Sequence, residues 1–410
     1  MMNNVNKTKL LLSSLSVFRG IMKRSVPKAY YNLLLSLEKE PDEFLNAYGD
    51  FYSLISERGC SDKLAYSMTE AALFDENCFT KAAAAGKYDS LPENVLKAVK
   101  RDCEAILMAS SLTSDEVLES YKHYDEIKDV ADSLPKWQSG ECATSFKMFD
   151  GSLINVAQYY RENGCGIFAR YQAFIWRDGD IQPVLHPDRI DMESFTGYEI
   201  QRDRVVNNTR SFIEGKSCNN CLLYGDKGTG KSSTVKAIAN EFRKDGLRIV
   251  EIPKERLIDF PILVDKIAAL PMKFIIFIDD LSFQKQDQSY TTLKAVLEGG
   301  LAARPDNALI YATSNRRHLV KESFADRTDD DINTRDNMQE SLSLSDRFGL
   351  AVCYSVPTKK EYLEIVYALA KEKGLNMTEE ELASGAERFA LARGGRSPRC
   401  AKQYVESLYC

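Results

Sequence analysis

Residues 225–232 read Gly-Asp-Lys-Gly-Thr-Gly-Lys-Ser and match the pattern G-x-x-x-x-G-K-[ST] at every fixed position. The Leu-Leu-Tyr stretch at residues 222–224 indicates a β-strand ahead of the loop. Behind it, four apolar side chains fall at the spacing of one helix face: Val235, Ile238, Ala239 and Phe242. This order of strand, loop and helix predicts a loop that binds phosphate groups. The alternative is a glycine-rich turn that meets the pattern by chance, and the flanking elements disfavour it.

The residue types of this loop suit a polyphosphate. Glycines let backbone N–H groups approach the anion closely, and the helix N-terminus adds partial positive charge. Lys231 is expected to reach the β and γ phosphates, and Ser232 to give its hydroxyl to Mg²⁺. The predicted cofactor-binding residues are Gly225, Asp226, Lys227, Gly228, Thr229, Gly230, Lys231, Ser232 and Ser233.

Two adjacent carboxylates follow a fully apolar stretch at residues 274–278. Charge at the exit of a buried strand is costly unless a cation meets it. Asp279 is therefore predicted to hold Mg²⁺ together with Ser232, and the adjacent Asp280 is a candidate catalytic residue. The alternative is an acidic strand end that merely faces solvent, which is less expected after an intact phosphate loop.

The region after Gly197 alternates strand-like and helix-like segments, which predicts an α/β fold, a parallel sheet flanked by helices. The expected strands are Cys221–Tyr224, Ile249–Ile252, Phe274–Ile278, Leu309–Thr313 and Leu350–Val356. Residues 358–409 read as helices again. Their expected starts are the capping boxes Thr358 with Glu361 and Thr378 with Glu381, and the pair Ser397-Pro398.

The sequence before Gly197 predicts helices and one hairpin. Residues 25–132 show helical periodicity without a catalytic motif, and Leu134–Gly140 reads as a boundary. A helix is expected over Leu153–Arg161, and a β-hairpin over Phe168–Trp176 and Ile181–Leu185 around an Asp-Gly turn. The predicted domains are an all-α N-terminal domain (1–135), a linker with helix and hairpin (136–196), the α/β core (197–357) and a helical lid (358–410).

Composition and charge limit the class of protein. The 410 residues are 44% hydrophobic with a net charge of −6, which disfavours a general nucleic-acid coat but leaves a local cationic groove open. No apolar run reaches the length of a membrane-spanning helix. The N-terminal stretch lacks a cleavage site, so a cytoplasmic protein is expected. Cys218 and Cys221 form a lone CxxC, and the three histidines, His123, His186 and His318, are far apart, so no zinc site is predicted.

Several further stretches resemble those of AAA+ ATPases. They are residues 220–225, 279–283, 297–300, 304–307, 311–319 and 344–349. From about Gly164 to the C-terminus the chain resembles in particular a bacterial family of AAA+ proteins known as a domain of unknown function, DUF 815. The resemblance implies an AAA+ P-loop core with a helical lid. AAA+ proteins that hydrolyse ATP usually carry glutamate where this chain has Asp280, and the shorter side chain leaves the rate of hydrolysis open.

The resemblance also implies roles for three polar residues. Asn315 matches the sensor-1 position, which contacts the γ-phosphate or the attacking water; read alone, it is a turn residue at a strand end. Arg347 matches the arginine finger that completes a neighbouring subunit's site, with an ion pair inside its own chain, for instance to Asp346, as the alternative. Arg399 matches the sensor-2 arginine of the lid, with Arg396 as the alternative carrier.

Together these features predict a Mg²⁺-dependent ATPase that acts as a switch. ATP would bind between core and lid with residues 197–199 over the adenine, and copies of the chain would form a homo-oligomer through Arg347. The N-terminal helices would bind an unidentified protein, and the charged segment Lys321–Glu340 reads as a loop, with a partner-binding insertion as its alternative. Membrane association is not expected.

Two other functions stay open at the level of sequence. One is a scaffold that binds ATP with negligible turnover, which the aspartate at position 280 favours. The other is a nucleic-acid-dependent loader, supported only by Arg316, Arg317, His318 and the C-terminal arginines.

Overall fold

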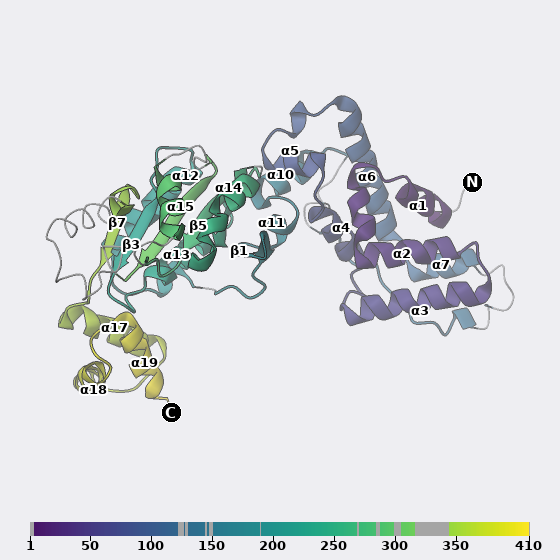
Figure 1. Ribbon diagram of the computed structural model, residues 1–410. Coiled ribbons are helices and arrows are strands. Elements are labelled where there is room, and N and C mark those ends of the chain that lie inside the picture. The colour runs from purple at the N-terminus through teal and green to yellow at the C-terminus, as the bar shows by residue number, and fades with distance from the viewer. Residues whose placement is uncertain are drawn as a thin grey trace. The chain divides into compact units, whose positions relative to one another are not determined.

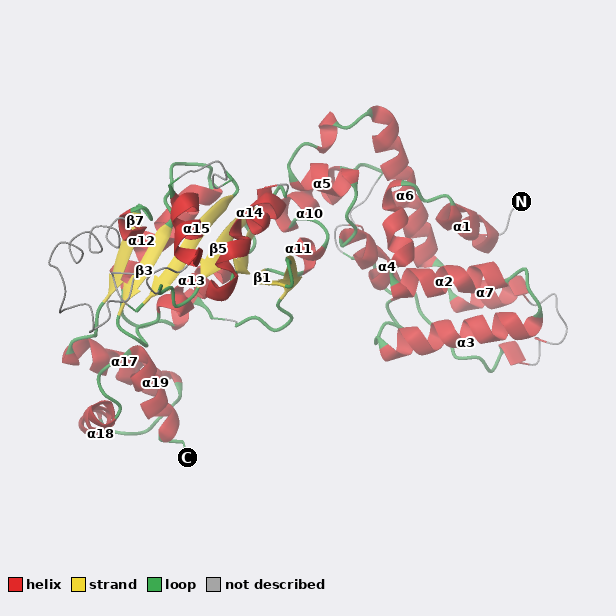
Figure 2. Cartoon of the chain, in the orientation of Figure 1, coloured by secondary structure: helices red, strands yellow, loops and turns green. Residues whose placement is uncertain are grey.

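The computed structural model describes residues 4–121, 130–143, 151–188, 190–268, 270–283, 288–298, 305–315 and 344–409, together with Ile127 and Phe146. The chain forms two compact units that divide after Arg170 (Figure 1). The first unit is helical, and the second contains a sheet and further helices (Figure 2). The predicted fold class, an α/β core with a helical lid after an all-α N-terminal region, is confirmed.

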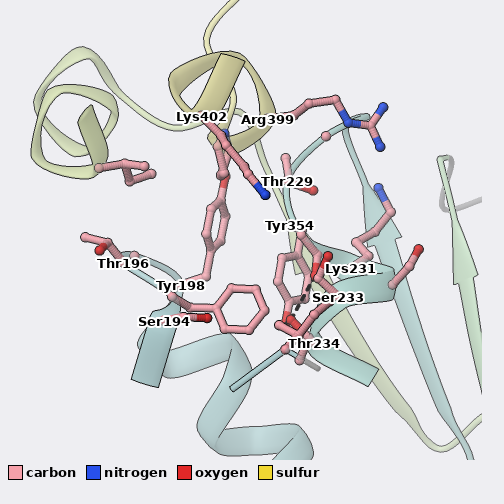
Figure 3. A pocket seen from close by; sticks show the side chains of 18 of the residues that line it. Ser194, Thr196, Tyr198, Thr229, Lys231, Ser233, Thr234, Tyr354, Arg399 and Lys402 are labelled. Carbon is pink, nitrogen blue, oxygen red and sulfur yellow. Dashed lines mark hydrogen bonds between the residues drawn. The ribbon is translucent and has the colours of Figure 1, made fainter. Parts of the chain in front are cut away.

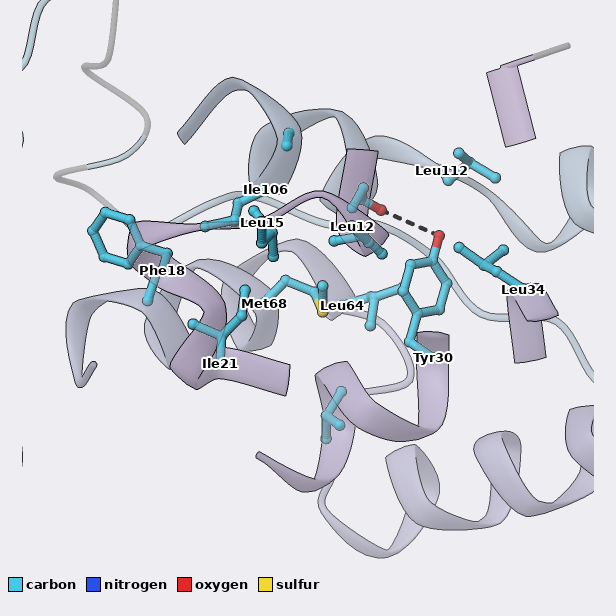
Figure 4. Packing of buried hydrophobic residues seen from close by; sticks show 14 of the residues in the cluster. Leu12, Leu15, Phe18, Ile21, Tyr30, Leu34, Leu64, Met68, Ile106 and Leu112 are labelled. Atoms are coloured by element: carbon cyan, nitrogen blue, oxygen red, sulfur yellow. Dashed lines mark hydrogen bonds between the residues drawn. The ribbon is translucent and has the colours of Figure 1, made fainter. Parts of the chain in front are cut away.

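The N-terminal unit packs its helices around one hydrophobic core. Trp137 is 2% exposed, and its indole packs edge-on against Tyr30 and Phe51 at centroid distances of 6.5 and 5.1 Å. Aliphatic side chains such as Leu12 and Met68 fill the rest of this core (Figure 4). The helices are α1 (Asn4–Ser13), η1 (Val17–Lys23), α2 (Ser25–Ser36), α3 (Pro41–Glu57), α4 (Leu64–Leu73), α5 (Cys78–Ala84), η2 (Tyr88–Ser90), α6 (Glu93–Ser111), α7 (Ser114–Tyr121), α10 (Ile154–Asn163) and α11 (Ile167–Arg170).

This helical unit extends past residue 135, where the sequence indicates a boundary. The segment Leu134–Gly140 is packed against the unit, because Trp137 is buried and the Gln138 N–H donates to the Ser61 carbonyl at 2.8 Å. Helix α10 packs on α5 and belongs to the same unit. A proline, a glycine and polar neighbours suggested a connection here, whereas the buried indole fixes the segment in place.

The second unit is built on a seven-stranded sheet with the order β2-β1-β4-β5-β6-β3-β7. All neighbouring strands run parallel except β1 and β2. The five predicted core strands are all present, with ends that differ from prediction by at most two residues. The strands are β1 (Ala173–Arg177), β2 (Asp180–Pro183), β3 (Cys221–Gly225), β4 (Leu247–Glu251), β5 (Lys273–Ile278), β6 (Ala308–Ser314) and β7 (Leu350–Tyr354).

The predicted hairpin forms the edge of this sheet, so it belongs to the α/β core and does not lie in a linker. Strand β1 pairs with β4 as well as with β2. The turn residues Asp178 and Gly179 have φ angles of 53° and 74°, the backbone of a type I′ turn. Phe168 was expected to begin the first strand but lies in α11, and pairing starts only at Ala173. Short apolar runs do not distinguish a helical turn from a strand.

Helices flank the sheet, and the last three form a separate lid (Figure 1). The flanking elements are η3 (Met192–Ser194), α12 (Glu199–Ile213), α13 (Lys231–Glu241), η4 (Lys254–Asp259), α14 (Phe260–Ala268) and α15 (Gln288–Leu297). The lid helices α17 (Lys359–Glu372), α18 (Glu379–Ala392) and α19 (Pro398–Ser407) share a core of their own. Both predicted capping boxes form, and Ser397 caps α19. Within the described residues, no helix has both the length and the apolar character needed to cross a membrane.

Candidate nucleotide-binding site

A cavity of about 730 Å³ lies where the phosphate loop meets the carboxyl ends of β5 and β6 and the lid (Figure 3). Five parts of the second unit line it: residues 190–202, the loop with the start of α13, the ends of β5 and β6, Tyr354 at the end of β7, and helices α17 and α19. Of the nine predicted cofactor-binding residues, residues 227–233 line the cavity directly. The structure therefore brings the phosphate loop and the predicted catalytic residues Asp280, Asn315 and Arg399 into one space.

The glycines of the loop allow close approach of other backbone segments. Gly225 has a φ of 129° and packs so closely on β7 that a Cβ would overlap the Tyr354 carbonyl oxygen. Gly228 has a φ of 77°, and a Cβ there would lie 3.1 Å from Ser397 Oγ and from Arg399 Cβ. An L side chain is rarely found with such angles. The loop thus leaves its backbone, rather than side chains, facing the lid.

Lys231 is almost completely buried at the end of the loop, with 6% of its surface exposed. Its Nζ donates to the carbonyls of Gly225 and Asp226 at 2.9 and 2.6 Å, and lies 3.4 Å from Asn315 Oδ1. Burial lowers the pKa of Lys231; the nearby carboxylates, Asp226 foremost, oppose this effect, and the Arg399 guanidinium adds to it. A buried ammonium group close to a second cation is an environment that an anion would stabilise.

Side chains from α13, from β6 and from the residue after β6 hold both carboxylates that follow β5. Asp279 Oδ1 accepts hydrogen bonds from Ser232 Oγ at 2.6 Å and from Thr313 Oγ1 at 2.5 Å. Asp280 Oδ1 accepts one from Asn315 Nδ2 at 2.6 Å. Asp280 has a φ of 50°, in the left-handed region, and its N–H donates to Thr313 Oγ1 at 3.0 Å. The two acidic side chains are thereby fixed by separate partners at one edge of the cavity.

Ser232 and Asp279 fit a magnesium ion that is bound together with phosphates. Mg²⁺ prefers hard oxygen ligands and usually takes one or two carboxylates, water and substrate phosphates rather than a complete protein cage. The Ser232 hydroxyl and the Asp279 carboxylate lie in contact beside the phosphate loop. Within the described part of the chain, no group of three or more His, Cys, Asp or Glu side chains could hold a metal by itself. The donor set therefore suits a nucleotide-bound metal.

The lid contributes Arg399 rather than Arg396 to the cavity. Arg399 lies in the first turn of α19, its N–H donates to the Gly228 carbonyl at 3.1 Å, and its side chain extends over the phosphate loop (Figure 3). Lys402 lines the cavity from the same helix. Arg396 forms a two-pronged ion pair with Glu387, with N···O distances of 2.9 and 2.7 Å, and does not line the cavity.

Aromatic side chains line another part of the cavity. The Tyr198 ring stacks on Tyr354 at a centroid distance of 5.2 Å, and its hydroxyl donates to the Ser355 carbonyl at 2.6 Å. The Arg202 guanidinium lies 5.5 Å from the centre of the Phe195 ring. Apolar lining on the lid side comes from Ile365, Leu369 and Val405. Apolar and aromatic surfaces of this kind suit a planar base.

The phosphate loop is hydrogen-bonded to the segment that leads into the lid. The Asp226 N–H donates to the Tyr354 carbonyl at 2.9 Å. In return, the Val356 N–H donates to the Asp226 carboxylate at 3.0 Å. Two residues later Thr358 begins the lid as the cap of α17. The root of the lid and the loop are thus joined directly.

Arg347 lies outside the cavity of its own chain. Its guanidinium pairs with Glu298 at 2.7 Å, and each of the two side chains is 35% exposed. The partner is therefore Glu298, beyond the end of α15, and not Asp346, which the sequence suggested. An exposed pair of this kind contributes at most about 1 kcal/mol to stability.

Sequence reasoning missed several residues at this site. Thr313 had a usable signal, because it lies two residues before Asn315 and successive alternate residues of a strand share a face. Tyr354 and Lys402 had no signal in the sequence, since only tertiary packing brings them to the loop. Three predicted features lie outside the described residues: the segment Lys321–Glu340, the run Arg316-Arg317-His318, and His123.

The topology and the site together define the class of protein. The phosphate-loop strand lies between β6 and β7, an acidic pair follows β5, an asparagine follows β6, and a helical lid ends the chain. This arrangement is that of an AAA+ P-loop protein. A protein-family model described as "Protein of unknown function (DUF815)" matches residues 169–410, more than half of the chain. The chain belongs to this family.

Solved structures show a distant likeness. The RuvB Holliday junction branch migration motor of Thermotoga maritima matches with a TM-score of 0.37 and 16% identity, over 54% of this chain and 64% of that one. Two single-residue variants of that protein match with TM-scores of 0.38, at 16% and 15% identity and the same coverage. The chain thus spans less than two thirds of the RuvB chains it matches. A comparison with curated proteins gives no match.

Proposed function

We propose that this protein binds ATP with Mg²⁺ in the cavity and hydrolyses it to change the orientation of the lid. The observation that carries the proposal is the meeting of two cations at the phosphate loop. Lys231 comes from the core and is almost fully buried, and Arg399 comes from the first turn of α19. A cation in that first turn is opposed by the helix dipole. A polyphosphate between core and lid would stabilise both charges.

The side chains suggest a division of roles. Lys231 and the loop amides would hold the β and γ phosphates, and Arg399 would reach the same anion from the lid. Ser232 and Asp279 would hold Mg²⁺, which when bound offsets phosphate charge. Asp280 would accept the proton of the attacking water, and Asn315, already hydrogen-bonded to it, would orient that water or the γ-phosphate. The aromatic side of the cavity, with Tyr198, would take the adenine.

Exchange of Asp280 for asparagine tests whether this carboxylate drives hydrolysis. The amide keeps an Oδ1 acceptor for Asn315 but cannot accept a proton. Asp280→Asn is expected to bind ATP with nearly wild-type affinity while phosphate release falls by about 10²- to 10⁴-fold, the usual contribution of a general base. Equilibrium titration with a fluorescent ATP analogue and steady-state phosphate release measure the two quantities. Undiminished release in this variant would remove Asp280 from the catalytic role.

A scaffold that holds ATP without turning it over is the second candidate. The short carboxylate of Asp280 and its hydrogen bond to Asn315 favour this function, since both draw the side chain back toward β6. Wild-type phosphate release no faster than that of Lys231→Met, together with tight ATP binding, would establish the scaffold and reject hydrolysis. Among the described C-terminal arginines, Arg393 lies over the Phe389 ring and Arg396 pairs with Glu387, so neither supports the nucleic-acid alternative.

Arg399 and Arg396 offer a matched pair for testing the lid. Arg399→Ala is expected to lower kcat/KM for ATP about 10- to 100-fold, because a hydrogen bond to a charged group contributes about 1.5–3 kcal/mol. Arg396→Ala removes an arginine of the same lid whose partner is Glu387, and a change of less than about threefold is expected because exposed ion pairs contribute little. Equal losses in the two variants would show that the lid merely needs its positive charge.

The wider function is proposed on the same basis. We infer that copies of the chain associate so that Arg347, outside its own cavity, reaches the site of a neighbour. The N-terminal helical unit, none of whose described residues lines the cavity, would bind the protein on which the switch acts. A cytoplasmic location would suit both roles and the thiol groups of the free cysteines.

A further inference from the structure

Thr313 makes an unusual set of contacts for a threonine in the middle of a sheet. Its side-chain oxygen donates to Asp279 Oδ1 at 2.5 Å and accepts from the Asp280 N–H at 3.0 Å. Its carbonyl oxygen accepts from the Leu281 N–H at 2.7 Å. Three consecutive residues after β5 are therefore bonded to this one residue of β6. Thr313 is 2% exposed, so its own side chain has little contact with water.

We propose that Thr313 is a positioning residue for the magnesium site, acting through Asp279 and Asp280. The inference rests on the proposed function of the cavity, in which Asp279 holds Mg²⁺ and Asp280 acts on water. The chemistry is direct: a hydroxyl has one proton and two lone pairs, so it can donate to Asp279 and accept from Asp280 at once. Each bond fixes one of the two adjacent carboxylate residues.

The bond to Asp279 sets the orientation of that carboxylate. Asp279 Oδ1 accepts hydrogen bonds from both Thr313 and Ser232. Rotation of the carboxylate about the Cβ–Cγ bond is therefore restrained from two sides. The Ser232 hydroxyl can continue to donate its hydrogen bond to Asp279 Oδ1 while a lone pair of the Ser232 oxygen faces a metal ion. Outer-shell partners that orient metal ligands usually change metal affinity or activity about 10- to 100-fold when they are replaced.

The bond to Asp280 stabilises an uncommon backbone conformation. A non-glycine residue with φ near 50° is disfavoured unless its surroundings hold it. Here the N–H of Asp280 is held by Thr313 and its side chain by Asn315, two residues further along the same chain segment. Thr313 and Asn315 thus hold Asp280 at its backbone and at its carboxylate, respectively. Without the hydroxyl, the Asp280 side chain is expected to lose its fixed position beside the cavity.

Three variants separate this role from a general effect on folding. Thr313→Val keeps the shape but removes both hydroxyl bonds, and Thr313→Ser restores them. Thr209→Val is the matched control: Thr209 is also a fully buried threonine of the same core, bonded to the Val205 carbonyl at 2.9 Å and to the Tyr311 hydroxyl at 2.8 Å, but it does not line the cavity.

The measurement is the Mg²⁺ concentration that gives half-maximal binding of a fluorescent ADP analogue, followed by the Mg²⁺ dependence of phosphate release. Thr313→Val is expected to need about 10- to 100-fold more Mg²⁺ than the wild type and to show a lower kcat at saturating Mg²⁺. Thr313→Ser and Thr209→Val should stay within about threefold of the wild type, a difference well below the outer-shell effect. Thermal melting checks that each variant is folded.

Wild-type Mg²⁺ dependence in a folded Thr313→Val, or no recovery in Thr313→Ser, would overturn the inference while leaving the proposed function intact. A wild-type chain that fails to bind the nucleotide with Mg²⁺ would overturn both. Should Thr313→Val not fold, Thr313→Cys takes its place, since the thiol is close in size but a weak donor and acceptor. The same increase in the Mg²⁺ requirement is expected of that variant.

Discussion

Lys231→Met is expected to weaken ATP binding about 10- to 100-fold and to reduce phosphate release to the level of a sample without protein. The methionine keeps the aliphatic length of the side chain but removes the ammonium group, which has three oxygen neighbours in a residue that is 6% exposed. A hydrogen bond to a charged group contributes about 1.5–3 kcal/mol, and about 1.4 kcal/mol is a tenfold change in affinity. The larger effect on release follows because charge on the γ-phosphate oxygens has to be stabilised during the reaction.

Two measurements make this result interpretable. Isothermal titration with a non-hydrolysed ATP analogue and Mg²⁺ gives the affinity, and a coupled phosphate assay gives the rate. Lys244→Met serves as the control, because Lys244 is an exposed lysine of the same α/β core that does not line the cavity. Wild-type affinity in Lys231→Met, with an unchanged melting temperature, would reject a phosphate-binding role for this loop.

Arg347→Ala is expected to lower kcat for ATP hydrolysis about 10³-fold or more, the range seen when an arginine finger is lost. ATP affinity should change far less, because Arg347 does not line the cavity of its own chain. The guanidinium is accessible in the single chain, where its partner Glu298 is itself one-third exposed. Replacement of that weak contact by phosphate oxygens of a neighbour costs little.

Glu298→Gln distinguishes the finger from an ordinary ion pair. If Arg347 only stabilises its own chain, breaking the pair from the glutamate side will reproduce the loss of activity. If it acts in a neighbour, Glu298→Gln will stay active, and a mixture of Arg347→Ala with Lys231→Met chains will regain part of the wild-type rate. Mass measurements with and without ATP and Mg²⁺ report the assembly directly. A mixture that stays inactive while both variants assemble would exclude action between subunits.

Local sequence patterns predicted the α/β part of this protein well. The phosphate loop, the acidic pair and the lid caps each depend on residues close together in the chain, and each element is present in the structure. The position of β1 beside β4 could not be predicted, since it depends on pairing between residues over seventy positions apart, such as Ala173 and Ile249. The burial of Trp137 in the helical unit is another long-range contact of this kind.

Motif spacing predicted only the part of the candidate site that lies in the phosphate loop and at the strand ends. Lys231, Ser232 and Asp279 follow from motif spacing, and the structure places them together. The resemblance favoured Arg399 and left Arg396 as its alternative. The fold separates the two, because Arg399 lines the cavity and Arg396 pairs with Glu387. The partner of Arg347 also depended on packing, as Glu298 is distant in sequence.

The hydrogen bonds between Asp226 and residues 354–356 have a consequence for regulation. Because the loop and the base of α17 are bonded, a lid orientation that strains one strains the other. Thermodynamic linkage then makes the coupling reciprocal. A molecule that binds one lid orientation more tightly must change the affinity for the nucleotide by a certain factor, and the nucleotide must change the affinity for that molecule by the same factor. A protein that contacts only the outer surface of the lid would therefore control nucleotide exchange without approaching the cavity.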